Sequence, residues 1–257
     1  MKRSLYLVFT MLVFTAWLQP SKASIEMSAM NTQLVNQTIR KMLTMDSSII
    51  AINVLLKPDK KLFDLAVQTN ARLLKDYPKG FPLDRSHVPH ITLIQLYITA
   101  NDLNKVIEVV SNEVKSANVF NLKLKVKGFK SSKWDDVGVT VLEIDDNLAL
   151  SLFEQKLVTS LEPFIIKGGG NKAFIANDDG TAVGTRIIKY VDEFVPLHSG
   201  DKYSPHLTVG VASMEFLTNL EKEEYASFSF SPSAVAIYQL GDFGTARKEL
   251  WSWSLDK

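Results

Sequence analysis

Two short stretches far apart in the chain carry the same local pattern. They are Pro89-His90-Ile91-Thr92-Leu93 and Pro205-His206-Leu207-Thr208-Val209, each leading into further apolar residues. Such a run is typical of a strand. Because side chains alternate between the faces of a strand, each histidine points the same way as the threonine two positions later, while the aliphatic residues point into a core. The repeat therefore predicts two similar strands that each present an imidazole and a hydroxyl.

Two imidazoles that face one cleft suit chemistry at phosphorus. An in-line displacement requires a proton to be removed on one side of the phosphorus and another to be delivered on the opposite side. The unperturbed pKa of histidine, about 6.5, allows one copy to be neutral while the other is charged. A threonine hydroxyl can donate a hydrogen bond to a non-bridging phosphate oxygen. His90 and His206 are thus candidate catalytic residues, and Thr92 and Thr208 are candidate phosphate-binding residues.

The paired motifs resemble the signature of the two-histidine (2H) phosphoesterase superfamily, a pair of His-hydrophobic-Thr/Ser-hydrophobic motifs. This superfamily includes 2′-5′ RNA ligase-like and RNA 2′,3′-cyclic phosphodiesterase enzymes. The resemblance covers about residues 49–254 and fits least at 164–203. It implies hydrolysis of a cyclic phosphate or related diester in a nucleotide or RNA-derived small substrate. It also implies an aromatic side chain at the cleft from a late strand, a role that Tyr238 could take if it is not packed in the core.

The N-terminus predicts a signal peptide at residues 1–23. Lys2-Arg3 precedes an apolar run from Leu5 to Leu18, and Ser21-Lys22-Ala23 supplies small residues for cleavage near Ala23. The apolar run is shorter than the ~20 residues of a membrane span, so we expect no stable membrane insertion after processing. The protein is thus expected to be exported, either periplasmic or secreted.

The remainder reads as a lead-in at 24–48 and a single bilobal domain at 49–257. The expected strands are 49–56, 88–98, 118–129, 137–145, 205–212, 226–240 and 246–254, with a polar turn at 130–136, and the expected helices are 60–76, 101–115, 148–163 and 214–225. Both halves read as helix, motif strand, helix and two strands. This order predicts an α+β fold of two pseudo-symmetric lobes, about 49–145 and 146–257. Each lobe would be mainly antiparallel sheet with helices on its outer face, and both motifs would lie in a central groove.

Residues 164–203 have no counterpart in the first half and are interpreted as an insertion. The run Gly168-Gly169-Gly170 is typical of a turn, and the apolar residues from Ile187 to Phe194 predict one short amphipathic helix. A long excursion that leads into a motif strand is commonly a lid or specificity segment. His198, in this insertion, is a candidate substrate contact.

The composition limits the class of protein but does not identify a substrate. The formal charge of +1 and 46% hydrophobic residues fit an ordinary globular protein, and the lack of cysteine means that a core must supply the stability. Two histidines without carboxylates or cysteines at ligand spacing fall short of a zinc site, so no metal or cofactor is expected. We expect a monomer.

Several alternatives remain open from the sequence. The 2H scaffold could bind nucleotides or a protein without turnover, or it could carry 2′-5′ RNA ligase-type activity. The alternating Lys123, Lys125 and Lys127 could track phosphates, but a solvated sheet face is favoured. Gln95 and Tyr97 should face away from the cleft if their strand is regular. Which histidine is the acid and which is the base is not decided.

Overall fold

The protein's structure is a computed structural model that describes residues 30, 31, 33 and 48–254. The chain divides into two units, Met1–Met45 and Asp46–Lys257, and the fold presented here belongs to the second. The predicted signal peptide lies outside the described residues, as does nearly all of the predicted lead-in. Within the described part, no helix is both long and apolar enough to cross a membrane.

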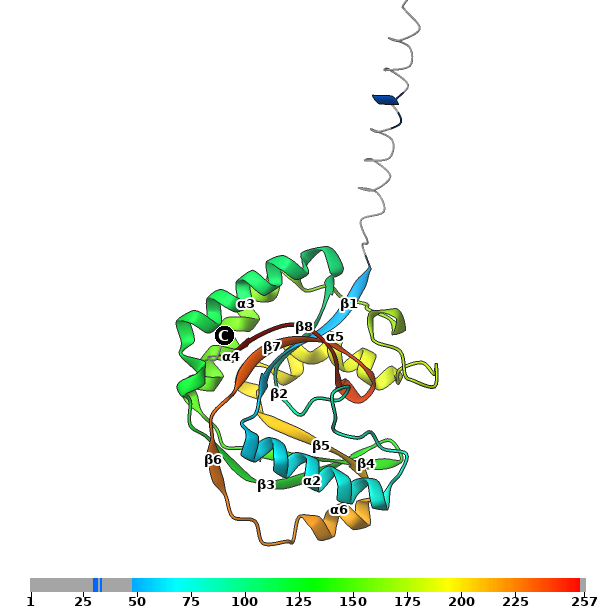
Figure 1. Cartoon of the computed structure of the whole chain (residues 1–257), viewed down its shortest axis with the longest axis vertical. Coiled ribbons are helices and arrows are strands. Elements are labelled where there is room, and N and C mark those ends of the chain that lie inside the picture. The colour runs from blue at the N-terminus through cyan, green and yellow to red at the C-terminus, as the bar shows by residue number, and fades with distance from the viewer. Residues whose placement is uncertain (1–29, 32, 34–47, 255–257) are drawn as a thin grey trace, which may run out of the picture. The chain divides into compact units, whose positions relative to one another are not determined.

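A curled antiparallel sheet forms the centre of the fold (Figure 1). Within residues 48–254 it has eight strands in the order β6-β3-β4-β5-β2-β1-β7-β8. The strands are β1 (Ile49–Lys57), β2 (Ile91–Thr99), β3 (Leu124–Trp134), β4 (Val137–Ile144), β5 (His206–Ala212), β6 (Phe228–Phe230), β7 (Ala234–Leu240) and β8 (Ala246–Ser254). The motif strands β2 and β5 are neighbours at the middle of the sheet, where Ile91 pairs with Leu207. The predicted α+β class and the adjacent motif strands are confirmed.

Each half of this sheet combines strands from both halves of the sequence. Outward from the centre, β2 is followed by β1, β7 and β8, whereas β5 is followed by β4, β3 and β6. Each motif strand therefore has one non-motif strand beside it, β1 next to β2 and β4 next to β5. These two neighbouring strands decide what lies next to each histidine.

Helices cover the convex face of the sheet, and one helix lies on the inner face. The helices are α2 (Lys60–Asp76), α3 (Leu103–Ala117), α4 (Leu148–Leu161), α5 (Thr185–His198) and α6 (Met214–Leu220). The main core contains Leu93 and Leu207 of the motif strands together with residues of α2, α3, α4 and α6. Burial of each such leucine contributes about 1.5–3 kcal/mol, which fixes the histidines on the opposite face. Ile187 and Val191 of α5 pack on that opposite face in a second cluster.

Local sequence signals account for the helix starts. Asp59 caps α2 by accepting a hydrogen bond from Leu62 N at 3.0 Å. Ser213 caps α6 by accepting one from Phe216 N at 3.2 Å, although α6 ends at Leu220, earlier than expected. The predicted helix within the insertion is confirmed as α5.

The predicted turn at 130–136 is mostly strand, because β3 continues to Trp134. Cross-strand contacts explain the extension: Ser131 Oγ donates to Thr140 Oγ1 at 3.0 Å, and Lys130 pairs with Glu143 at 2.8 Å. Only residues 135–136 form the turn. As a result, side chains expected in a loop lie instead on the inner face of the sheet.

Each motif strand contains a bulge directly after its threonine. In the β1–β2 ladder Val54 pairs with Ile94 and Leu55 with Thr92, so Leu93 is an extra residue. In the β4–β5 ladder Val209 is the extra residue in the same way, since Thr140 pairs with Gly210 and Val141 with Thr208. The first bulge reverses the alternation of side chains along β2.

This reversal corrects the prediction for Gln95 and Tyr97, which point to the same face as Thr92. Gln95 pairs with Asn53 and Tyr97 with Ala51, on the inner face of β1. Tyr97 is fully buried beneath the insertion, where its hydroxyl donates to Ile188 O at 2.9 Å. Gln95, in contrast, lines the same cavity as the motif histidines.

Candidate active site

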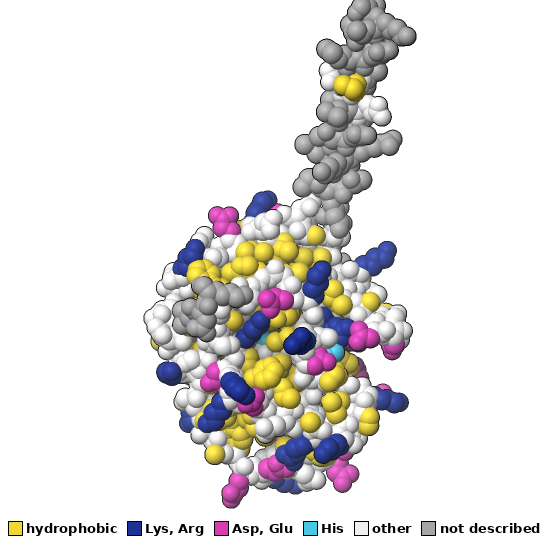
Figure 2. Space-filling model, in the orientation of Figure 1, with side chains coloured by type: hydrophobic (Ala, Val, Ile, Leu, Met, Phe, Trp, Pro, Cys, Tyr) yellow, Lys and Arg dark blue, Asp and Glu magenta, His cyan; other side chains and the backbone are white. Residues whose placement is uncertain are grey.

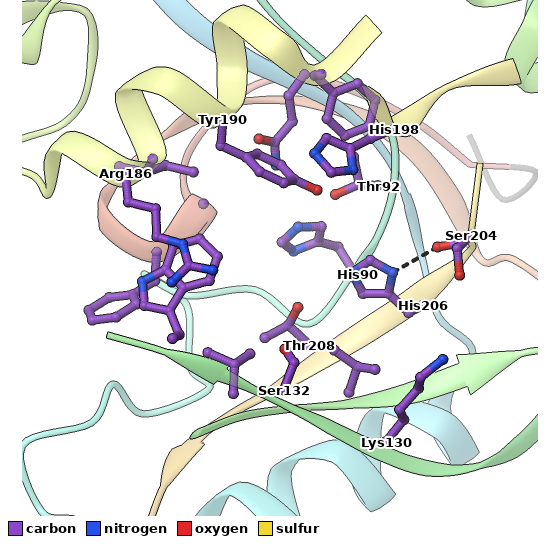
Figure 3. Close-up of a pocket in the computed structure, with 18 of the residues that line it drawn as sticks. His90, Thr92, Lys130, Ser132, Arg186, Tyr190, His198, Ser204, His206 and Thr208 are labelled. Carbon is purple, nitrogen blue, oxygen red and sulfur yellow. Dashed lines mark hydrogen bonds between the residues drawn. The ribbon is translucent and has the colours of Figure 1, made fainter. Parts of the chain in front are cut away.

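A cavity of about 380 Å³ lies on the inner face of the sheet and is closed on one side by α5. Both motifs contribute to its lining, which includes His90, Thr92, His206 and Thr208. Figure 3 shows the two imidazoles projecting into this space, with Tyr190 and His198 on one side and Ser132 and Thr208 on the other. The structure therefore brings the four predicted motif residues together.

The two histidines are held by the same backbone contact. His90 Nδ1 lies 2.7 Å from the carbonyl oxygen of Val88, and His206 Nδ1 lies 2.7 Å from that of Ser204. A carbonyl oxygen only accepts, so each Nδ1 carries a hydrogen and donates it. In the neutral ring the other nitrogen, Nε2, is then the basic atom. The proline before each histidine fixes the backbone between this donor and its acceptor.

Asn53 lies against the first motif and makes it different from the second. Its amide nitrogen is 3.1 Å from His90 Nε2 and donates to Thr92 Oγ1 at 3.0 Å. Asn53 is fully buried, and its Oδ1 has no hydrogen-bond partner within the described part of the chain. Sequence reasoning missed this residue, although a single polar side chain inside the apolar strand 49–57 was the available signal.

A charged pair occupies the corresponding position beside the second motif. Glu143 of β4 is the register partner of His206, and its carboxylate lies 2.8 Å from Lys130 Nζ of β3. Both Glu143 and Lys130 line the cavity. The first histidine thus has an amide as its neighbour, whereas the second has a carboxylate and an ammonium group.

Burial shifts the titration of both motif histidines. Desolvation is the largest cause that lowers the pKa of His90, the Val88 carbonyl partly opposes it, a charge on His206 adds to it, and the resulting pKa is about 4. Desolvation also lowers the pKa of His206, but there the Ser204 carbonyl and the Glu143 carboxylate oppose the effect. A bound phosphate anion would raise the pKa of both imidazoles, because an opposite charge favours the protonated form.

The insertion forms one wall of the cavity. His198, at the end of α5, lines the cavity and stacks on Tyr190 with ring centroids 4.4 Å apart. Burial lowers the pKa of His198, and a charge on His206 lowers it further. The structure thus places the predicted substrate-contact residue His198 close to the second motif.

An aromatic group lines the cavity at the end near Arg186. The Arg186 guanidinium lies 4.0 Å from the centroid of the Trp134 ring, and Trp134 is 6.3 Å from Phe243, centroid to centroid. Phe243 is 39% exposed and has a positive φ of 54°, a backbone conformation that L-residues rarely adopt. Gln95 also lines the cavity, and its buried Oε1 has no hydrogen-bond partner among the described residues. Figure 3 shows Arg186 on the far side of the cavity from His206.

Sequence reasoning did not find this aromatic group. Trp134 was placed in a polar turn, and Phe243 lay in a Gly-rich connection, Gly241-Asp242-Phe243-Gly244. A large aromatic residue in a turn was the signal that could have indicated a ligand contact.

Tyr238 is not among the residues of the described part of the chain that line this cavity. Its ring is 4% exposed and clusters with Leu55 and Ala236. Its hydroxyl donates to Glu249 Oε2 at 2.6 Å. Tyr238 is on the same face as its register partner Asn53, but Val88 packs against this cluster. The alternative of core packing is the one observed.

Lys123, directly before β3, and Lys125 and Lys127 of β3 have partners that do not line the cavity. Lys125 and Lys127 both lie within 4 Å of Asp145, at 3.6 and 3.8 Å, and Lys123 donates to Ser231. Figure 2 shows positive and negative side chains interspersed on the visible face. These three lysines therefore fit the solvated sheet face. Among the described residues, no group of three or more His, Asp, Glu or Cys side chains is arranged to hold a metal ion.

No family model matches the sequence, and no curated protein matches it. Among solved structures, the chain is similar to the crystal structure of E. coli LigT complexed with 3′-AMP. The identity is 12%, the TM-score is 0.38, and the alignment covers 82% of this chain and 100% of that chain. A likeness of this size assigns neither a substrate nor the role of any residue.

Proposed function

We propose that this protein is a two-histidine phosphodiesterase that needs no metal and hydrolyses a cyclic phosphate or a related nucleotide phosphodiester. The observation that carries the proposal is the pair of imidazoles in one cavity, each held through Nδ1 by the carbonyl two residues before it. This arrangement leaves Nε2 as the basic atom of each ring, one from each motif, in the cavity that would hold the ligand. A 2′,3′-cyclic nucleotide or RNA end is the favoured substrate.

The reaction needs only these two groups and water. One neutral imidazole accepts a proton from water as the water oxygen forms a bond to phosphorus. The bond from phosphorus to the leaving oxygen breaks, and the other, protonated imidazole donates its proton to that oxygen. The products are a phosphomonoester and an alcohol, which in a cyclic substrate remain in one molecule. Solvent exchange then returns both histidines to their starting protonation states.

The threonines supply hydrogen bonds where negative charge develops. Thr92 Oγ1 accepts from Asn53, so its own hydrogen remains free to donate to a phosphate oxygen. Thr208 also lines the cavity. Donors positioned in advance at such oxygens stabilise the transition state more than the ground state.

The aromatic group suits the nucleoside part of the substrate. A nucleobase can stack on Trp134 or Phe243, and a guanidinium such as Arg186 is itself a stacking partner. The amide of Gln95 can pair with the donor and acceptor groups at a base edge. The cavity volume of about 380 Å³ is in the range of small-ligand sites, which favours a mononucleotide or the end of an RNA.

Incubation of the protein with a substrate panel, with a chelator present, tests the proposal. The panel contains 2′,3′-cyclic nucleotides, 3′,5′-cyclic nucleotides and 2′-5′ linked oligonucleotides. We expect turnover of at least one member, with 2′,3′-cyclic nucleotides first, and an unchanged rate in chelator. Binding without turnover would support a nucleotide-binding module instead, and rates abolished by chelator would contradict metal independence.

A further inference from the structure

We infer that the two histidines have fixed and different roles: His90 is the general base and His206 is the general acid. Asn53 and Glu143 act as the positioning residues that make them different. The inference rests on the proposed phosphodiesterase function and deepens it. Its basis is the contrast between the strands on either side of the motif pair, since β1 places an amide beside one imidazole and β4 places a carboxylate beside the other.

Asn53 favours the neutral form of His90. Nδ1 of His90 donates to Val88 O, so Nε2 can accept a hydrogen from the Asn53 amide only if the ring is neutral. Protonation of Nε2 would set two donors against each other in a part-buried contact. A histidine held neutral is ready to accept a proton, which is the role of the base.

The same amide also controls access to the base. In the ligand-free structure the Asn53 N–H occupies the lone pair of His90 Nε2 at 3.1 Å, so the attacking water must replace it. The second amide hydrogen bonds Thr92 Oγ1 and can keep Asn53 in place during this exchange. Asn53 thus holds both the ring and the hydroxyl of the first motif.

Glu143 favours the protonated form of His206. Glu143 is in register with His206 on the neighbouring strand β4 and its charge raises the pKa of His206, whereas its partner Lys130 lowers that pKa by a smaller amount. The other titratable or charged side chains that line the cavity with His206 are His90, Glu143, Lys130, Arg186, Tyr190, His198, Lys202 and Tyr203. Glu143 is the one acid in this set, and it lies in register with His206. A protonated imidazole at this position can supply the proton that the leaving oxygen needs.

A leaving-group comparison tests the assignment. In a 4-nitrophenyl diester of the nucleotide, the leaving group departs as a phenolate that needs no protonation. In an alkyl diester or a cyclic phosphate, the leaving oxygen needs a proton from an acid. His206→Ala should therefore lose on the order of 10²–10⁴ in rate on the alkyl substrate and less than about tenfold on the aryl substrate. His90→Ala should lose a similar factor on both, because both need the water to be activated.

The possible results separate this inference from the proposed function. Rescue of His90→Ala, rather than His206→Ala, by the aryl leaving group overturns the assignment while leaving the phosphodiesterase function intact. Full activity of both variants on both substrates would reject two-histidine catalysis and the assignment with it. Circular dichroism of each variant excludes unfolding as the cause of a lost rate.

NMR titration of the histidine rings decides the inference without turnover. In the wild-type protein His206 should titrate at a higher pH than His90. Asn53→Asp should raise the pKa of His90, and Glu143→Gln should lower that of His206. The matched control is Glu223→Gln, which also breaks a carboxylate pair, with Arg72, but lies outside the cavity and should move neither histidine. A His90 that titrates above His206 would overturn the inference.

The two positioning variants should also shift different limbs of the pH-rate profile. Asn53→Asp should move the acidic limb to higher pH, because a base with a raised pKa becomes neutral later. Glu143→Gln should move the alkaline limb to lower pH, because an acid with a lowered pKa loses its proton earlier. The apparent pKa values of the two limbs belong to the coupled histidine pair and not to either residue alone. The leaving-group comparison is therefore needed to assign each limb to one histidine. Shifts in the opposite limbs would contradict the assignment.

Discussion

His206 Nδ1 lies 2.7 Å from the carbonyl oxygen of Ser204, two residues before it in the chain. Pro205, which separates the two residues, has no N–H, and its fixed φ restricts the backbone that carries both groups. The same relationship holds between His90 and Val88. The proline of each motif thus helps to hold Nδ1 against the carbonyl oxygen, which leaves Nε2 as the basic atom of the ring.

The first prediction concerns the threonine hydroxyls. Thr208→Val removes one hydrogen bond to a charged phosphate oxygen, so turnover should fall about 10- to 100-fold. The melting temperature should change little, because the side chain keeps its shape and is only half-buried. Steady-state kinetics and a thermal melt check this. Unchanged turnover would show that Thr208 does not contact the phosphate.

The second prediction concerns the aromatic group of the cavity. Phe243→Ala should raise KM or Kd for a nucleotide about 5- to 150-fold, the range given by about 1–3 kcal/mol per stacked base. Phe63→Ala is a matched control, since both rings are 39% exposed but Phe63 lies on α2 and not in the cavity lining. Isothermal titration with a nucleoside monophosphate measures the effect. Equal affinities of the two variants would contradict a base-stacking role.

The third prediction concerns stability and pH. Glu154 of α4 is fully buried, and burial raises its pKa to about 7, although a hydrogen bond from Gly200 N at 3.2 Å opposes the shift. The folded state therefore binds the proton more tightly than the unfolded state, and the free energy of unfolding should fall as the pH rises from about 4.5 to about 7.

Glu154→Gln should remove this dependence, because it keeps an acceptor for Gly200 N without the charge. The variant should gain stability over the wild type as the pH rises, measured by denaturant unfolding at pH 5 and pH 8. A constant difference between the two proteins at both pH values would show that Glu154 does not titrate in this window.

The fourth prediction concerns the N-terminus. From the charged, apolar and small-residue segments of residues 1–23 we propose export, with cleavage near Ala23. N-terminal sequencing of the protein recovered from the extracytoplasmic fraction should then begin at or near Ser24. An intact Met1 in that fraction would reject cleavage.

The motif strands and the helices could be predicted from the sequence because both depend on local patterns. The His-x-Thr alternation identified the two strands, and the apolar spacing identified the helices, whose caps Asp59 and Ser213 are local to the chain. The strand order was not predictable in this way. It depends on which strands of the two sequence halves pair, a long-range choice with no local signal.

The residues missed at the site have equally physical reasons. An extra residue at Leu93 reverses the alternation of β2, which turns Gln95 toward the cavity. Trp134 was missed because cross-strand pairing of polar residues extends β3 into what reads as a turn. Asn53 contacts His90 only because β1 pairs with β2. Each of these depends on register, which a single strand does not specify.

The most direct test of two-histidine catalysis is turnover of the best panel substrate by His90→Ala, His206→Ala and the double variant. Each single replacement should cost on the order of 10²–10⁴ in turnover. The double replacement should cost less than the product of the two, because groups that act as a unit are not additive. Folded single variants that retain full activity would contradict the account.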